Sequence, residues 1–138
     1  MTRPAFALAT GLIAALPFPA QAADYYAGKT VDVVVGSLGD PREASTLADY
    51  PNPPRAIVLT DGARGGQVET HAGLAHFRPS PAPSPIVGSY GAGDSFAGAL
   101  VYFLATGHSP IEAAARAAAY GAAVLSSLIP LDAQLALR

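Results

Sequence analysis

The sequence predicts an α/β fold, because two short β-branched strands come first and two longer helices follow. With 138 residues, the chain has about the length of one domain. Residues 31–35 are a β-branched run between Gly28 and Gly36, and residues 56–60 are a second, apolar run; both are typical of buried strands. From Asp94 onward the apolar residues recur at helical spacing instead. This order predicts a small sheet with helices packed on it.

Composition excludes several classes of protein. Hydrophobic residues make up 51% of the chain, charged residues 13%, and the formal net charge is -2. A disordered acidic chain and a binder of nucleic acid are therefore excluded, because the first lacks apolar residues and the second needs a basic face. The chain has no cysteine, which excludes a thiolate nucleophile and a sulfur-ligated metal site.

The first 22 residues have the order of a secretory signal. Arg3 precedes an apolar run over 5–18, and residues 20–22 read Ala-Gln-Ala. We therefore divide the chain into a signal-like segment, 1–22, and a domain, 23–138. The alternatives for 1–22 are a buried helix or a wrongly assigned start codon. A stable membrane span is excluded, because the run is short and is interrupted by Pro17 and Pro19.

The next residues predict a βαβ unit with parallel strands. Asp40 stands before Pro41 and three residues before Glu43, which is the pattern of a helix start and predicts a short helix to about Ala48. Three prolines between 51 and 54 end it, and the strand at 56–60 follows.

A β-hairpin is expected next, with arms at 67–71 and 74–78. His71 and His76 fall on opposite arms; a zinc site would need a third ligand, so exposed polar residues are the simpler interpretation. Residues 80–85 form a proline-rich connection without helix, and 86–87 form a strand stub.

Two helices close the sequence. The first has one apolar stripe and ends at Gly107; the stripe consists of Phe96, Ala99, Leu100, Phe103 and Leu104. Ser109, Pro110 and Glu112 form a capping box for an alanine-rich helix that runs to Leu125. The last eight residues are expected to form a loose tail or a terminal turn.

The glycine-rich loop at 88–96 is the main candidate for a functional site. Gly91 and Gly93 leave the backbone amides open, and the following helix adds the positive end of its dipole, so the loop suits an anion. A carboxylate at Asp94 could act as a general base beside a transferring phosphoryl group. The alternative is a tight turn in which Asp94 only caps the helix.

Residues 90–98, Tyr-Gly-Ala-Gly-Asp-Ser-Phe-Ala-Gly, resemble the C-terminal signature of the ribokinase-like (PfkB) carbohydrate kinases, which phosphorylate sugars, nucleosides and related alcohols from ATP. Residues 33–43 resemble the family's segment near magnesium and phosphate. Residues 60–66 resemble its loop at the ATP phosphates, and 113–124 its helix beside the adenine pocket. The implied fold is a partial three-layer ribokinase-like sandwich, made of the βαβ unit, the hairpin and the two helices.

The resemblance also implies the roles of particular residues. Asp94 would be the catalytic base, and the amides of Gly91, Ala92 and Gly93 the anion hole. Nucleotide contacts would come from Thr60, Gly62 and Gly65, and the magnesium and phosphate region would include Asp40 and Glu43. The implied cofactors are ATP and Mg²⁺, with no residue assigned as a direct metal ligand; the other partner is a sugar-like small molecule. Arg64 either reaches a phosphate or only solvates its turn.

Three departures from the family pattern accompany this resemblance. Gly88 stands where the family usually has an aspartate near a monovalent cation, and residues 126–130 lack the family's glycine-rich stretch. The family's N-terminal, sugar-binding half has no counterpart, so 23–138 is interpreted as a truncated kinase domain without a complete active site of its own, for which a homo-oligomer or a complementing chain is a possible partner.

A second function class stays open beside the kinase. Residues 23–31 are similar to the start of exported receptors of the tripartite tricarboxylate transporter type. The alternative is therefore a non-catalytic exported binding or interaction protein, or a gene fragment. A kinase would be cytoplasmic, whereas a functional signal would place the chain in the periplasm or outside the cell.

Overall fold

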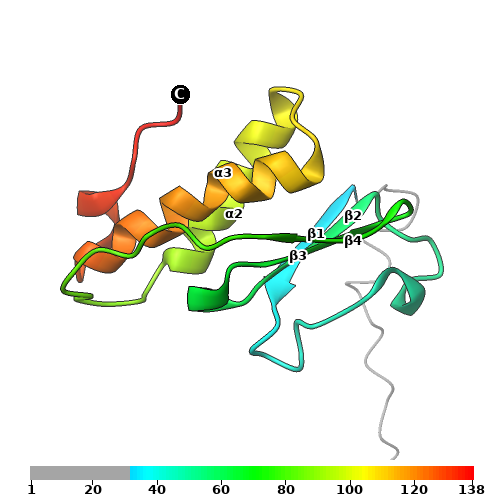
Figure 1. Cartoon of the computed structure of the whole chain (residues 1–138), viewed down its shortest axis with the longest axis horizontal. Helices are drawn as coiled ribbons and strands as arrows, with labels where there is room; N and C mark the ends of the chain where they lie inside the picture. Colours follow the sequence, from blue (N-terminus) through cyan, green and yellow to red (C-terminus); the bar gives the residue numbers. More distant parts are fainter. Residues whose placement is uncertain (1–31) are drawn as a thin grey trace, which may run out of the picture.

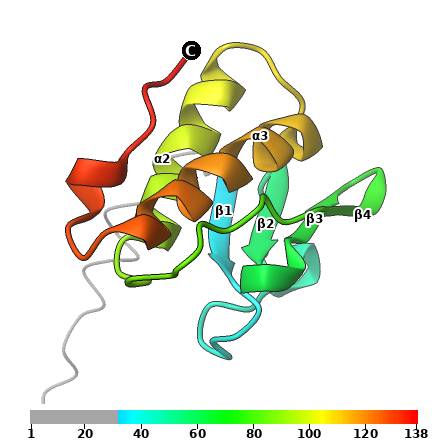
Figure 2. The ribbon, with the colours of Figure 1, turned by 60° about the vertical axis from the view of Figure 1, so that its left-hand side comes forward.

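The computed structural model describes residues 32–138, so the signal-like segment 1–22 and the receptor-like segment 23–31 lie outside the described residues. Four strands form one sheet in the order of the sequence (Figures 1 and 2): β1 (Val33–Ser37), β2 (Ala56–Thr60), β3 (Gly66–Thr70) and β4 (Gly73–Phe77). β1 and β2 are parallel, and the other pairs are antiparallel. The predicted parallel pair and hairpin are confirmed.

Both α-helices of residues 32–138 cover one face of this sheet, as Figure 1 shows. They are α2 (Ala92–Ala105) and α3 (Pro110–Ala123), which pack against each other. The helices and the sheet share one hydrophobic core, in which the rings of Phe77 and Phe96 stack with centroids 5.7 Å apart. Burial of these apolar side chains is the main force that holds the two layers together.

The opposite face of the sheet is covered by the crossover between β1 and β2. Ile57 and Leu59 alternate with core residues and point away from the helices, yet they are 1% and 2% exposed. A Cβ built on Gly36 would lie 2.8 Å from the carbonyl oxygen of Glu43, so the crossover lies directly against β1. The Leu47 amide donates a hydrogen bond of 3.0 Å to the Glu69 carboxylate.

The helix predicted from Asp40 to Ala48 does not form. The Asp40 carboxylate accepts from the Arg42 amide at 2.9 Å and from the Arg42 guanidinium at 2.8 Å, and the chain makes a single turn there. A 3-10 helix, Leu47–Asp49, follows with Thr46 as its cap. The Asp40 carboxylate therefore closes a single turn, and the chain after this turn lies directly against β1 instead of continuing as a helix.

The strand stub predicted at 86–87 is also wrong. The Val87 amide donates 2.8 Å to the carbonyl of Leu125, so this segment is attached to the end of the helical layer instead of the sheet. The proline-rich connection before it contains no helix, as predicted.

The two helices start and end close to the predicted residues. α2 begins at Ala92, two residues before Asp94, because Gly91 adopts a φ of 78° and serves as its N-cap. The capping box of α3 is confirmed: the Ser109 amide donates 3.0 Å to the Glu112 carboxylate, and the Glu112 amide donates 3.4 Å to the Ser109 hydroxyl.

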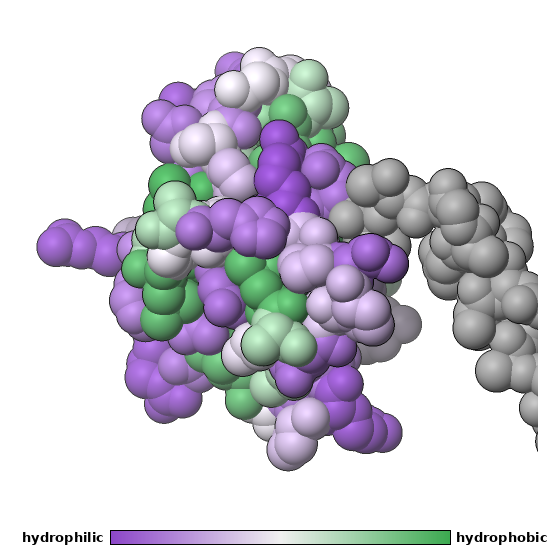
Figure 3. Space-filling view, turned by 90° about the vertical axis from the view of Figure 1, so that its right-hand side faces the viewer, coloured by the Kyte–Doolittle hydropathy of each residue, from purple (hydrophilic) through white to green (hydrophobic). Residues whose placement is uncertain are grey.

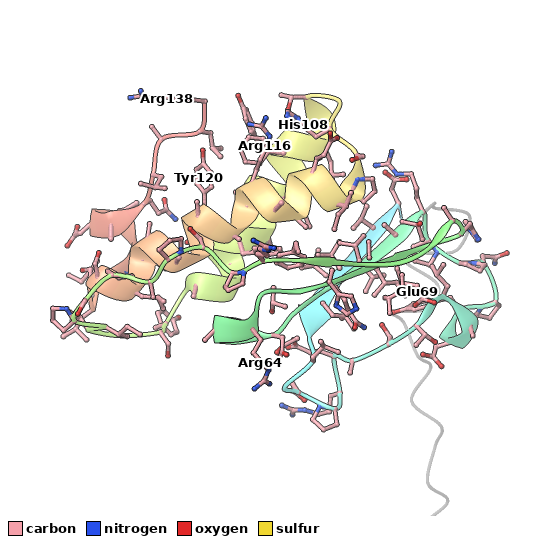
Figure 4. The ribbon with its side chains drawn as sticks, in the orientation of Figure 1. Arg64, Glu69, His108, Arg116, Tyr120 and Arg138 are labelled. Atoms are coloured by element: carbon pink, nitrogen blue, oxygen red, sulfur yellow. The ribbon has the colours of Figure 1, made fainter. Side chains whose placement is uncertain are left out.

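The last residues form short 3-10 turns, Val124–Ser126 and Pro130–Ala133, and then an extended tail. The Tyr120 hydroxyl donates 3.3 Å to the carbonyl of Ala136, so this tail lies beside α3 (Figure 4). The face of the molecule shown in Figure 3 is largely hydrophilic, with small apolar groups between the polar residues. Between residues 32 and 138, none of the helices is long and apolar enough to cross a membrane.

Candidate functional site

A hollow of about 470 Å³ lies between the sheet and the helices. Its lining comes from the loop after β2, the end of β4, the proline-rich connection, the start of α2 and the last turns of α3. The lining residues are Thr60, Gly62, Ala63, Gly65, Phe77, Pro79, Ser80, Ala82, Ile86, Ser89, Ala92, Gly93, Phe96, Ala118, Gly121, Ala122 and Leu125. No charged side chain is among them. We call this the larger hollow.

A tight turn after β2 forms one wall of the larger hollow. Gly65 has a φ of 93°, and a Cβ there would lie 2.8 Å from the nitrogen of Pro79, so only glycine fits. The turn is closed by an ion pair: Nε and Nη2 of Arg64 each lie 2.7 Å from the Asp61 carboxylate. This hydrogen bonding lowers the pKa of Asp61.

Arg64 itself does not enter the larger hollow. Its side chain is 81% exposed and points away from the helical layer (Figure 4). Of the two roles left open for it, the structure favours closure of the turn, since its guanidinium is already paired with Asp61.

A second hollow, of about 350 Å³, lies at the carboxyl end of β1 and is called the smaller hollow. Its lining residues are Val35, Gly36, Ser37, Glu43, Thr60, Gly93, Asp94, Phe96 and Ala97. Two carboxylates, Glu43 and Asp94, are its only charged groups, and both residues are exposed. This hollow is therefore acidic where the larger one is uncharged.

The two hollows meet at the first turn of α2, because Thr60, Gly93 and Phe96 line both. Among residues 32–138, the amides of Gly93 and Asp94 have no hydrogen-bond acceptor, whereas the Ala92 amide donates weakly to the Ser89 carbonyl at 3.4 Å. Open amides at the positive end of a 14-residue helix stabilise negative charge. The junction of the hollows is therefore suited to an anion.

The structure places most of the residues singled out from the sequence in the lining of one or both hollows. Glu43 and Asp94 line the smaller hollow. Five others line the larger one: Thr60, Gly62, Gly65, Ala92 and Gly93.

Two of the predicted residues line neither hollow. Gly91 is the N-cap of α2, where Pro130 packs so closely that a Cβ would lie 2.7 Å from its ring. Asp40 is paired with Arg42 at 2.8 Å, and this hydrogen bond lowers the pKa of Asp40. Asp40 therefore stabilises its own turn and does not face the junction.

Sequence reasoning missed the wall formed by Pro79, Ser80, Ala82 and Ile86. Prolines in a connection gave no chemical signal of a site. The available clue was topological, since Gly66 and Phe77 pair across the hairpin and so bring residue 79 beside the turn after β2.

The described residues hold no cluster of three or more histidine, aspartate or glutamate side chains that could bind a metal ion. His71 and His76 are both exposed on the hairpin. A Mg²⁺ ion at the junction would find one carboxylate, Glu43, beside that of Asp94, and would have to take its other oxygen ligands from substrate and water.

Three solved structures show what this fold resembles. Inosine-bound nucleoside kinase from Burkholderia thailandensis superposes with a TM-score of 0.66 and 17% identity, over 75% of this chain and 36% of that one. A putative ribokinase II from E. coli, in complex with ATP and Mg²⁺, gives 0.65 and 21%, over 83% and 39%. Aminoimidazole riboside kinase from Salmonella enterica, with its riboside and an ATP analog, gives 0.61 and 23%, over 75% and 38%.

These likenesses confirm the ribokinase-like α/β fold predicted from the sequence. The chain spans little more than a third of the length of the three proteins it matches. A search of curated proteins found no match. The profile of the pfkB family of carbohydrate kinases, however, matches residues 32–129, which is most of the sequence. The chain therefore belongs to the pfkB carbohydrate kinase family.

Proposed function

We propose that this chain carries out ATP-dependent phosphoryl transfer to a hydroxyl of a sugar-like molecule or nucleoside. The observation that carries the proposal is the junction at Gly93, where an uncharged hollow and an acidic hollow meet beside two open amides. A phosphate at that junction would stand between a nucleotide on one side and an acceptor on the other.

The larger hollow suits the nucleotide. Its volume of about 470 Å³ falls within the range of small-molecule sites, roughly 300–1,000 Å³. Ala118 and Ala122 of α3 and Leu125 of the 3-10 turn that follows offer an uncharged, apolar contact for the base. The phosphates would extend toward Gly93 and the turn at Gly62, where backbone amides are the available donors.

The smaller hollow suits the acceptor, with Asp94 as the general base. The acceptor oxygen attacks the γ-phosphorus, its proton passes to the Asp94 carboxylate, and the bond from the γ-phosphorus to the bridging oxygen of ADP breaks. The amides of Gly93 and Asp94 would stabilise the charge on the transferred phosphoryl group. Exposure of Asp94 allows its carboxylate to reach the acceptor and to release the proton to water.

Mg²⁺ bound to the ATP phosphates would neutralise charge that no cationic side chain of either hollow neutralises. Glu43 is the residue of this chain best placed to hold it or its water ligands. The two carboxylates also select the acceptor: an anionic acceptor such as a sugar phosphate would be repelled, so a neutral hydroxyl compound is favoured.

The test combines binding and turnover. Calorimetry with MgATP should show binding by the wild-type chain and by Asp94→Asn with similar affinity. Phosphoryl transfer from labelled ATP to ribose or inosine should fall by at least about 100-fold in Asp94→Asn, because the base is lost. Asp132→Asn, an exposed carboxylate in the last 3-10 turn, is the matched control and should keep full transfer.

A wild-type chain that does not bind MgATP would contradict the whole proposal. Binding without transfer to any neutral acceptor would instead favour a second candidate, a nucleotide-binding module without turnover. That candidate is supported by the exposure of Asp94, because a carboxylate that stays in contact with water could serve only to cap α2.

A further inference from the structure

The first turn of α2 carries the open amides of the junction, and Gly91 is the residue that starts this turn. The Ser95 amide donates the first hydrogen bond of the helix to the Gly91 carbonyl, at 2.9 Å. An N-cap usually fixes its turn through a side-chain oxygen, but Gly91 has no side chain. The position of the open amides therefore depends on what packs against this turn from outside.

Pro130 packs against the turn from one side. A Cβ built on Gly91 would lie 2.7 Å and 2.9 Å from two carbons of the Pro130 ring. The ring belongs to the 3-10 turn Pro130–Ala133, which lies at the same end of the helical layer as the loop before α2 (Figure 1). Pro130 is half-buried, whereas its neighbour Leu131 is 77% exposed. Pro130 is thus the residue of this 3-10 turn that contacts the cap.

The segment that carries Pro130 is attached to the domain on both sides of the proline. Before it, the carbonyl of Leu125 accepts a hydrogen bond of 2.8 Å from the Val87 amide. After it, the carbonyl of Ala136 accepts one of 3.3 Å from the Tyr120 hydroxyl. These two attachments hold the Pro130 ring against Gly91.

α3 packs against the same turn from a second side. A Cβ built on Gly121 would lie 3.0 Å from the carbonyl oxygen of Ala92 and 3.3 Å from the Cβ of Phe96. Gly121 stands inside α3, where glycine is less favourable than alanine. The close contact with Ala92 is what a glycine allows at this position. Gly98, inside α2, differs because nothing lies within 4 Å of a Cβ built there.

We propose that Pro130 and Gly121 are positioning residues, which hold the first turn of α2 between them and so fix the open amides of Gly93 and Asp94. The effect on turnover rests on the proposed function, in which these amides face the transferred phosphoryl group. Such donors act well only when they are held within about 0.5 Å of the productive geometry. Pro130 lines neither hollow, so its substitution tests position without changing the walls of the site.

The first test measures hydrogen exchange of the Ser95 amide in the full chain and needs no nucleotide. Pro130→Ala removes most of the ring that packs on Gly91, so exchange at Ser95 should rise at least about fivefold. The Ala113 amide is the reference, because it donates the matching first bond of α3 to the Ser109 carbonyl at 2.9 Å, and its exchange should not change. Unchanged exchange at Ser95 would overturn the inference, and so would an equal rise at both amides.

The second test separates positioning from stability. In transfer from labelled ATP to inosine, Pro130→Ala should lower kcat at least about fivefold and change the KM for MgATP less than about twofold. The reason is that the displaced amides act on charge that develops in the transition state. Pro130→Val keeps apolar bulk over Gly91 and should restore most of the rate. Leu131→Ala, in the same 3-10 turn, is the matched control and should keep full turnover.

A second matched pair tests the contact from α3. Gly121→Ala and Gly98→Ala both place a better helix former inside a helix, but only the first new Cβ meets Ala92. The kcat should fall at least about threefold in Gly121→Ala and should stay within about 1.5-fold of wild type in Gly98→Ala. Equal rates in the two variants would overturn the role of Gly121.

The outcomes also distinguish this inference from the proposed function. If the wild-type chain does not bind MgATP, the proposed function fails, while exchange at Ser95 still decides whether Pro130 holds the turn. If the wild-type chain transfers phosphate and Pro130→Ala does so at the same rate, Pro130 only stabilises the fold and the inference is wrong. An equal loss of rate in Leu131→Ala would also overturn it, because contact with Gly91 would then not be the cause.

Discussion

The two hollows that meet at Gly93 differ in the charge of the side chains that line them. The larger one has walls from β2, β4, the proline-rich connection and both helices, and its lining is uncharged. The smaller one lies between the carboxyl end of β1, the crossover, the end of β2 and the start of α2, and it carries two carboxylates, Glu43 and Asp94. We therefore propose the uncharged hollow for the nucleotide, and the hollow with two carboxylates for the neutral acceptor and the proton that it loses.

The largest expected effect on the difference between the hollows comes from disruption of the turn after β2, because this turn lines only the larger hollow. Gly65→Ala should lower the free energy of unfolding by about 3 kcal/mol, because alanine is strained at a φ of 93° and its Cβ meets the backbone of residues 77–79. Urea denaturation measures this loss. MgATP binding should weaken in the same variant, since the turn is a wall of the larger hollow.

Gly62→Ala is the matched control for that turn. Gly62 also has a positive φ, 52°, but nothing lies within 4 Å of a Cβ built there. The expected cost is only about 1 kcal/mol, from backbone strain alone. Equal losses in the two variants would show that close packing against residues 77–79 does not hold the turn.

A bulky side chain in one hollow separates the two sites directly. Ala122→Leu fills part of the larger hollow and should raise the dissociation constant of MgATP about tenfold, or about 1.4 kcal/mol. Ala97→Leu, which lines only the smaller hollow, should leave that constant within about twofold. Calorimetry measures both. A larger effect of Ala97→Leu would reverse the assignment of nucleotide and acceptor sides.

The smallest expected effect lies at the start of α3, away from both hollows. Ser109→Ala removes the capping hydroxyl and should lower the free energy of unfolding by about 1 kcal/mol, without changing MgATP affinity. A change in MgATP affinity would show that the start of α3 influences binding in the larger hollow. Effects on that hollow could then not be assigned to its lining residues alone.

This capping box also sets a pH dependence. Hydrogen bonds from the Ser109 hydroxyl and amide lower the pKa of Glu112 below its usual 4.5. Because the folded pKa is the lower one, the stabilisation is complete above pH 4.5 and is lost as the pH falls through the folded value. Unfolding of Glu112→Gln, measured over the same acidic range, should lack this component of the decline.

Local patterns along the sequence predicted most of the elements and part of the site. The strand at 56–60, the hairpin and the capping box of α3 rest on spacings within a few residues, so they could be derived without tertiary contacts. The loop around Gly93 and Asp94 could also be found, because glycines before a helix have a direct chemical meaning.

Only the tertiary structure decided what these segments do together. The segment from Asp40 to Ala48 lost its predicted helix because it covers Ile57 and Leu59 on the sheet. Glu43 and Asp94 come from distant parts of the chain and share one hollow because α2 packs over the end of β1. Local spacing determines which element a segment can form, but packing between layers determines which side chains meet, and that depends on the whole chain.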